Sequence, residues 1–202
     1  MSVALSMLCA VLLDRLLGEP RRFHPLVGFG NYAVWLERHL NIGASRLRGV
    51  LAWCLALAPF IALFAWLWLQ PVLRFAVDVL ALYFALGMQS LSEHARRIAQ
   101  AMQASNLPLA RQRVGEIVSR DTSEMQEEDV ARAGVESVLE NGNDAVFGAL
   151  FWFALLGAPG ALAYRLANTL DAMWGYRNER FRQFGWAAAR LDDLLNLVPA
   201  RL

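Results

Sequence analysis

The sequence predicts an all-α, polytopic integral membrane protein that carries a helical segment on the cytoplasmic side. Of its 202 residues, 57% are hydrophobic and 18% are charged, whereas charged residues make up about 25% of a typical soluble domain. The run Val50–Leu69 contains no charged residue and is long enough to cross the hydrocarbon core of a bilayer. Because no segment shows the alternating pattern of a strand, we expect residues 1–202 to form a single membrane-embedded domain of helices.

The membrane elements follow from the apolar runs. Residues 1–13 lack the basic start and the small-residue cleavage site of a signal peptide, so we expect a helix that is retained. Val50–Leu69 has tryptophans near its ends and is expected to cross the membrane. After a Gln-Pro break, Val72–Leu91 is expected to return, which makes residues 50–91 a transmembrane helical hairpin.

Two charged residues interrupt the second run of this hairpin. Arg74 and Asp78 are four residues apart, so they lie on one face of a helix. An intramembrane charge of this kind is often functional, but a structural ion pair near the membrane surface explains the spacing equally well. The sequence leaves both interpretations open.

The distribution of arginines places the polar motifs on one side of the membrane. Arginines flank the hairpin on both sides, and the positive-inside rule therefore puts both flanks in the cytoplasm. The apolar run 145–163 is interrupted by Gly157-Ala-Pro159-Gly160. We expect a re-entrant or interfacial helix here rather than a complete span, because only that arrangement keeps every polar motif cytoplasmic. The flanking arginines are Arg21, Arg22, Arg38, Arg46 and Arg48 before the hairpin and Arg96, Arg97, Arg111 and Arg113 after it.

Residues 92–144 are expected to form a cytoplasmic helical segment. Helical periodicity covers residues 91–105, a second helix is expected over 109–118, and 119–123 read as a connection. Ser123 is expected to cap the third helix, with Gln126 at the capping-box position and acidic residues in the first turn. Residues 145–202 then supply the re-entrant or interfacial helix and a polar motif segment.

The charge composition excludes several classes of function. The formal net charge is +1 and all nineteen basic residues are arginine. The chain therefore offers neither a basic patch for nucleic acid nor a lysine for a P-loop, a kinase-type site or a Schiff base. Bound phosphate must be held by arginine, by backbone N–H groups or by a metal. Cys9 and Cys54 lie in apolar stretches without metal-like spacing, so we expect two buried thiols rather than a disulfide.

A polar stripe on the third helix is the first predicted site. Arg132, Glu136 and Glu140 are spaced four residues apart and lead to Asn141 and Asp144. The stripe is either a solvated face with an Arg–Glu pair or a partly buried pair of carboxylates beside further oxygen ligands. The second arrangement suits Mg²⁺, a hard cation, and apolar neighbours favour it.

The C-terminal run from Asn168 to Asn196 is the second predicted site. Carboxylates, carboxamides and guanidiniums alternate here with aromatics, and this mixture can build a phosphate or carboxylate site. Arg120-Asp121-Thr122 either binds an anion at a helix entrance or simply caps the helix. His24 lies in a turn, where a histidine is more often structural than a substrate contact. The residues of the run that carry this chemistry are Asn168, Asp171, Tyr176, Arg177, Asn178, Glu179, Arg180, Arg190, Asp192, Asp193 and Asn196.

Together these motifs resemble the adenosylcobinamide-phosphate synthase (CobD/CbiB) family of cobalamin biosynthesis. They are ordered along essentially the whole chain, and Ala145 stands where the family usually has glycine. Members of the family continue further at the C-terminus, so we expect this chain to lack that part. The matching motifs are Gly18-Glu-Pro20 with His24-Pro25, Ser119-Arg-Asp-Thr122, Arg132-Ala-Gly-Val-Glu-Ser137 leading into Glu140-Asn141 and Asp144, Asn168-Thr-Leu-Asp171, Gly175-Tyr-Arg-Asn-Glu-Arg180, Phe184-Gly-Trp186, and Ala189-Arg-Leu-Asp-Asp193 followed by Pro199-Ala-Arg.

The resemblance implies a ligase that joins the carboxylate of adenosylcobyric acid to aminopropanol or its phosphate. It implies Mg²⁺ and ATP as cofactors, a corrinoid and a small amino alcohol as ligands, contact with other corrinoid-pathway enzymes, and a place in the cell (inner) membrane with the motifs facing the cytoplasm. The alternatives are a regulatory or sensing membrane protein of the AmpE type and a transporter subunit. The expected roles are catalysis for Glu136, Glu140 and Asp171; metal binding for Glu140, Asp144, Asp192 and Asp193; and substrate binding for His24, Arg120, Asp121, Thr122, Asn141, Asn168, Tyr176, Arg177, Asn178, Glu179, Arg180, Arg190 and Asn196.

Overall fold

The structure, a computed structural model, describes residues 2–20 and 24–202, and the regular secondary-structure elements within them are all helices. This confirms the predicted all-α class. Met1 and residues 21–23 lie outside the described part, and with them the predicted cytoplasmic arginines Arg21 and Arg22. The elements are α1 (Val3–Leu17), α2 (Pro25–Leu40), α3 (Arg46–Trp68), α4 (Arg74–Ala85), α5 (Met88–Gln103), α6 (Leu107–Gly115), α7 (Glu127–Gly142), the π-helical turn η1 (Asn143–Phe147), α8 (Gly148–Trp174), α9 (Trp186–Asn196) and the 3₁₀ turn η2 (Pro199–Arg201).

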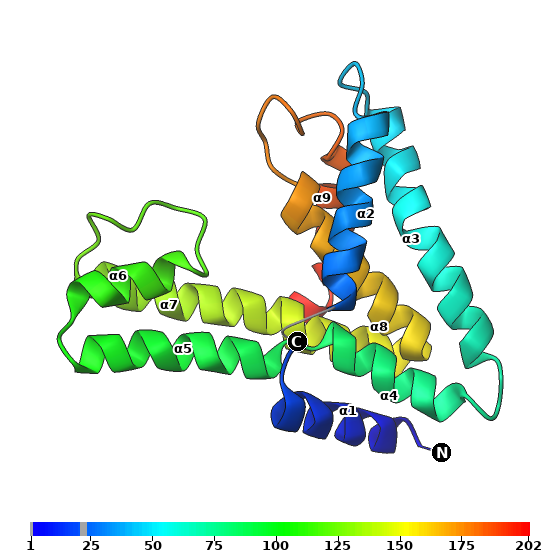
Figure 1. Ribbon diagram of the computed structural model, residues 1–202, viewed down its shortest axis with the longest axis horizontal. Helices are drawn as coiled ribbons and strands as arrows, with labels where there is room; N and C mark the ends of the chain where they lie inside the picture. The colour runs from blue at the N-terminus through cyan, green and yellow to red at the C-terminus, as the bar shows by residue number, and fades with distance from the viewer. Residues whose placement is uncertain (1, 21–23) are drawn as a thin grey trace.

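The molecule consists of a helical arm and a helical body (Figure 1). Helices α5, α6 and α7 extend together as the arm, while α2, α3, α9 and the second half of α8 stand side by side in the body. The arm has its own small core, which includes Ile98, Val114 and Val130. The largest body core joins α2, α3 and α8 through Phe29, Leu57 and other apolar side chains, including the buried Trp174. The arm and the body meet where α5 and η1 begin, and the polar motifs gather at this junction.

Three segments are long and apolar enough to cross a membrane, namely Arg46–Trp68, Arg74–Gln103 and Glu127–Trp174. The first contains the predicted span Val50–Leu69 except for Leu69, which caps its end, and forms one uninterrupted helix, α3. Several of its large apolar side chains are exposed, among them Leu47, Leu51, Leu63 and Trp66, as expected for a surface that contacts lipid. The prediction of buried thiols is wrong for Cys54, which is exposed on α3 because only a narrow stripe of this helix packs against the body.

The helix predicted over Val72–Leu91 is interrupted near its end. Helix α4 ends at Ala85 and α5 begins at Met88. The backbone N–H of Gly87 donates to the carbonyl oxygen of Ala145 in η1, 3.1 Å away. This contact fixes the start of the arm against the π-helical turn.

Arg74 and Asp78 do not form the ion pair that their spacing allows. The Arg74 guanidinium stacks on the ring of Trp68, 4.1 Å from its centre. Asp78 Oδ1 instead accepts hydrogen bonds from Trp68 Nε1 at 2.8 Å and from the backbone N–H of Ala158 at 3.1 Å. The carboxylate thus satisfies a backbone donor that the break in α8 leaves free.

The break in α8 occurs at Gly157, as the Gly-Ala-Pro-Gly sequence suggests. Its φ of 66° lies in the left-handed region, where only glycine fits without strain. The two halves of α8 point in different directions, and the second half turns back toward the upper end of the body (Figure 1). Gly157 packs against Trp68, at the end of α3 remote from Arg46. The division into a hairpin, a cytoplasmic arm and a re-entrant or interfacial helix stays a prediction.

The arm begins its third helix later than predicted. Helix α6 covers Leu107–Gly115, somewhat earlier than the expected 109–118. The N-cap of α7 is Gln126, whose backbone N–H donates to Asp129 Oδ2 at 3.1 Å. The predicted cap at Ser123 is therefore wrong, because the helix begins only at Glu127 and Ser123 belongs to the preceding loop, where its N–H donates to Asp121 Oδ1.

Candidate functional site

The π-helical turn η1 places a network of amide and carboxylate side chains inside the junction. Asn168 on α8 donates to Asp144 Oδ2 at 3.2 Å and lies 3.5 Å from Asp192 Oδ1. Asn196 on α9 donates to Asp192 Oδ2 at 3.1 Å. Tyr164 donates to Asn196 Oδ1 at 2.7 Å, and Asn143 donates to the same oxygen at 3.0 Å. The network joins η1, α8 and α9 and sets the orientation of the Asp144 carboxylate.

Asp192, on α9, has a strongly shifted pKa. Burial raises its pKa to about 6, and the negative charges of Asp171 and Asp144 act in the same direction. The hydrogen bonds from Asn196 and Asn168 oppose this shift. Three carboxylates therefore lie close enough for their charges to interact, which is the environment in which a carboxyl group can hold or move a proton near neutral pH.

A cavity of about 470 Å³ opens beside this network, between the arm and the body. Glu136, Glu140 and Asn141 line it from α7, Asp144 lines it from η1, and Tyr176 lines it from the loop before α9. Arg120 also lines the cavity, and its guanidinium pairs with Glu136 at 3.2 Å. Within the described residues the Glu140 side chain has no hydrogen bond or ion pair, so its carboxylate remains available to a ligand.

The four predicted metal ligands do not converge. In the part of the chain that the structure describes, no three histidine, cysteine or acidic side chains are arranged to hold a metal ion. Glu140 and Asp144 share the cavity, Asp192 lies in the network, and Asp193 lines a different cavity and pairs with Arg190 at 3.6 Å. Because Mg²⁺ is commonly held by one or two carboxylates together with substrate phosphates, Glu140 and Asp144 fit such a site without further protein ligands.

A second cavity of about 470 Å³ adjoins the first and shares Asn141 and Tyr176 with it. Its walls carry Glu19 from the end of α1, His94 and Glu116 from the arm, and Arg165 from α8. The turn that presents Glu19 is held by Tyr83, whose hydroxyl donates to the Gly18 carbonyl at 2.7 Å. It is also held by Asp14, whose Oδ2 accepts from the Gln89 N–H at 2.9 Å.

A third cavity of about 360 Å³ lies on the other side of Tyr176. It is lined by three arginines of the C-terminal motif region together with Trp186 and Asp193. The predicted substrate contacts Arg177 and Arg190 are two of these arginines, and Arg182 is the third. Tyr176 therefore stands where all three cavities meet.

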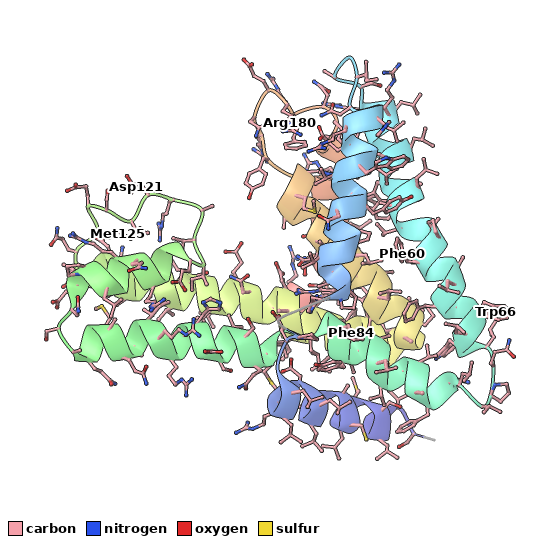
Figure 2. The ribbon with its side chains drawn as sticks, viewed as in Figure 1. Phe60, Trp66, Phe84, Asp121, Met125 and Arg180 are labelled. Atoms are coloured by element: carbon pink, nitrogen blue, oxygen red, sulfur yellow. The ribbon has the colours of Figure 1, made fainter. Side chains whose placement is uncertain are left out.

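Several predicted substrate contacts hold the loop before α9 instead of lining a cavity. Arg180 binds Glu37 through two hydrogen bonds of 2.6 and 3.1 Å, and this guanidinium lowers the pKa of the Glu37 carboxyl group. Asn178 Oδ1 accepts from the Phe181 N–H at 3.0 Å, and Glu179 is exposed. Figure 2 shows Arg180 on this loop, beside the upper end of α2.

The remaining predicted contacts lie in caps and turns. Asp121 is on the outer loop of the arm, well separated from Arg180 (Figure 2), and Thr122 follows it in the chain. The hydrogen bond from the Ser123 N–H lowers the pKa of Asp121, and the Thr122 hydroxyl donates to the Arg111 carbonyl at 3.0 Å. His24 Nδ1 accepts from the Leu26 N–H at 3.1 Å and so caps α2. Burial lowers the pKa of His24.

The structure adds residues that the sequence did not single out. Tyr164 and Asn143 complete the amide–carboxylate network, Glu37 is the partner of Arg180, and Arg165 lines the second cavity. Only Arg165 gave a usable signal, since a charge that follows an apolar run is often functional. Asp171, a predicted catalytic residue, is partly buried on α8, and its carboxylate has no hydrogen bond with the described residues; its backbone carbonyl accepts one from the Gly175 N–H at 2.7 Å.

A family model described as CobD/Cbib protein matches residues 7–202. The cobalamin biosynthesis protein CobD of Stutzerimonas stutzeri (strain A1501) is 62% identical over 206 residues, which covers 100% of this chain and 68% of that protein. The protein of the same name from Chromobacterium violaceum is 58% identical and covers 100% and 67%, respectively. The probable cobalamin biosynthesis protein CobD of Methanothermobacter thermautotrophicus is 38% identical and covers 100% and 68%. No solved structure gives a significant match.

Proposed function

Because the chain belongs to the CobD/CbiB protein family, and with it to cobalamin biosynthesis, we propose that it takes part in an amide-forming step. In this step the carboxylate of adenosylcobyric acid is joined to the amine of aminopropanol or of its phosphate. The chain spans about two thirds of the length of the relatives that it matches, so the proposal concerns the complete gene product. The observation that carries it is the cavity in which the free Glu140 carboxylate lies beside Asp144, Arg120 and Tyr176.

The chemistry explains why such a site needs both carboxylates and arginines. A carboxylate and an ammonium group do not condense readily in water, so the carboxylate must first be activated, and the family resemblance implies ATP as the phosphate donor. Phosphoryl oxygens and a tetrahedral oxyanion then carry negative charge, which positive groups stabilise. Mg²⁺, if it binds at Glu140 and Asp144, supplies Lewis-acid stabilisation of this charge.

The residues of the chain divide this task between them. Asp144 is oriented by Asn143 and Asn168, and Glu140 is free to approach a ligand. Asp171 lies close to the charges of Asp144 and Asp193, and we assign it as the general base that takes a proton from the ammonium group, so that the free amine attacks the activated carboxyl carbon and phosphate leaves as the amide bond forms. Arg120, Arg177 and Arg190 are the arginines that line cavities and can meet phosphate or corrin carboxylates.

The sizes of the cavities suggest how two very different substrates are accommodated. A corrinoid with its side chains is larger than any of the three cavities, so it must lie across their openings. A small amino alcohol fits within one of them. The apolar α3 keeps the site at the bilayer, and we propose that the polar face is on the cytoplasmic side of the cell membrane, where other corrinoid-pathway enzymes can deliver the substrate.

Complementation in cells tests the proposal. A strain that lacks the corresponding gene is supplied with cobyric acid or with cobinamide and then transformed with the complete gene. We expect the gene to restore growth on cobyric acid, while cobinamide supports growth with or without it. Growth on cobinamide alone, with the gene expressed and present in the membrane, would remove the proposed activity.

A further inference from the structure

The Arg165 guanidinium stands out among the polar groups of the described residues. Its Nε atom is buried and has no hydrogen-bond partner. Among the described residues, no hydrogen bond or ion pair involves the Arg165 side chain; the one side-chain hydrogen bond to this residue is made by the Thr169 hydroxyl, which donates to the Arg165 backbone carbonyl at 2.8 Å. A buried charge without a partner is costly, so a fold that retains one must gain from it elsewhere.

The surroundings of Arg165 form a cavity rather than a packed core. Arg165 lines the second cavity, opposite side chains of the arm. A methyl group at Gly87 would lie 3.3 Å from Glu19 Oε1 and 3.9 Å from a terminal nitrogen of Arg165. Glu19 and Arg165 therefore flank the bare backbone of Gly87 without forming an ion pair.

The other charges of the cavity are already matched. Glu116 pairs with Arg113 at 2.7 Å and lies 3.6 Å from His94 Nδ1. The hydrogen-bonding capacity that stays open is that of Arg165, a planar donor suited to two oxygens of one anion. The facing carboxylate of Glu19 stays open as well, so the two walls carry opposite charges.

We propose that Arg165 binds an oxyanion, either a phosphate or a carboxylate, of a small ligand that enters this cavity. Glu19 offers a partner for a positively charged group of the same ligand. This inference deepens the proposed function, and only the identity of the ligand rests on that function. An amino alcohol phosphate carries both charges, whereas a carboxylate would come from a side chain of the corrinoid.

Thermal unfolding of the complete gene product in detergent tests this site without turnover. The midpoint is measured in chloride, inorganic phosphate and propionate at equal ionic strength, with anions at low millimolar concentration. Arg165→Met removes the charge. Arg96→Gln is the matched control, because Arg96 is exposed on α5 and does not line the cavity.

We expect one anion to raise the midpoint of the wild type and of Arg96→Gln by several degrees and to leave Arg165→Met unchanged, since a ligand stabilises only the state that binds it. Phosphate as the effective anion assigns a phosphate group, and propionate assigns a carboxylate. Without added anion, Arg165→Met should be at least as stable as the wild type, because it no longer buries an unpaired charge. The proposal is overturned if neither anion acts, if Arg165→Met responds like the wild type, or if this variant is less stable or fails to fold. None of these results depends on whether the complementation test succeeds.

Discussion

At the residue scale, the side chains of Asp144, Asn168, Asp192 and Asn196 act as one unit, because hydrogen bonds join them across η1, α8 and α9. All four are predicted as site residues from the sequence. Arg180 was predicted as a substrate contact, but its partner Glu37 lies 143 residues earlier in the chain. No local pattern signals a pair at such a separation, so the structural role of Arg180 could not be recognised.

The raised pKa of Asp192 gives a pH dependence of stability. The pKa of its carboxyl group is about 6 in the folded protein, against the ordinary value of 3.8 that we assign to the unfolded chain. Between pH 3.8 and pH 6 the folded protein therefore binds more protons than the unfolded chain. The free energy of unfolding falls as the pH rises through this range. A shift of this size corresponds to about 3 kcal/mol, or on the order of 5–10 °C in the midpoint for a chain of this length.

The test is thermal unfolding in detergent, followed by circular dichroism between pH 4 and pH 7. Asp192→Asn removes the ionisation, so the variant should lose less stability over this range than the wild type. Parallel curves for the two proteins would show that another group causes the loss.

The Arg180–Glu37 ion pair is predicted to hold the loop before α9 against α2. Arg180→Gln leaves the buried Glu37 carboxylate without its charged partner, so the loop of residues 175–185 should be released from α2. Limited proteolysis should then cut within this loop several times faster than in the wild type. Arg182→Gln, on the same loop, serves as the control, because Arg182 forms no ion pair with the described residues. Equal cleavage of both variants would show that the Arg180–Glu37 pair does not hold the loop.

At the element scale, a helix can be predicted from the sequence where it coincides with one apolar run. A break can be predicted where glycine and proline interrupt such a run. Helix α3 and the interruption at Gly157 follow from composition. The interruption at Gly87 does not, because its cause is a contact with Ala145 in another element. The π-helical turn cannot be recognised from the sequence either, since its residues continue the helical pattern of α7.

The break at Gly157 yields a matched pair of substitutions. Gly157→Ala places a methyl group in the left-handed region, which costs about 1–2 kcal/mol, and brings it within 2.9 Å of Trp68. Gly28→Ala lies within α2 and meets no atom within 4 Å, so it should stabilise the helix by about 0.5–1 kcal/mol. Unfolding midpoints should move in opposite directions. A stabilising Gly157→Ala would mean that the two halves of α8 are not separated at this residue.

At the scale of the whole molecule, the sequence predicted a membrane protein but not the shape that brings its motifs together. The motifs lie on three separate stretches of chain, and the meeting of arm and body gathers them around Tyr176. The arginine distribution further predicts that both ends of α8 face the cytoplasm. The return of the second half of α8 after Gly157 is compatible with that topology (Figure 1).

Cysteine labelling in intact cells tests the topology. Cys9 and Cys54 are first replaced by alanine, since Cys54 is exposed, and single cysteines are then introduced at Arg182 and at Ser105. Both should be shielded from an impermeant thiol reagent added outside the cells and should react after lysis. Labelling of position 182 but not 105 in intact cells would show that α8 crosses the membrane completely.

The central claim is that the cavity beside η1 is the catalytic site, and Glu140 tests it most directly. Glu140→Gln keeps the shape of the side chain but removes the charge that a hard cation needs. In the complete gene product, amide formation from adenosylcobyric acid should fall by ~10- to 100-fold, as for other perturbed metal sites, and the Mg²⁺ requirement should rise. Asp171→Asn should also reduce turnover, without a change in that requirement.

Arg132→Gln, exposed on the same helix, is the control and should change the activation free energy by less than about 1 kcal/mol. The decisive measurement is therefore the Mg²⁺ dependence of turnover for Glu140→Gln beside Arg132→Gln, at equal protein levels in the membrane. Reduced turnover and a higher Mg²⁺ requirement in the first variant alone would support the account. Normal turnover with an unchanged Mg²⁺ requirement in Glu140→Gln would contradict it.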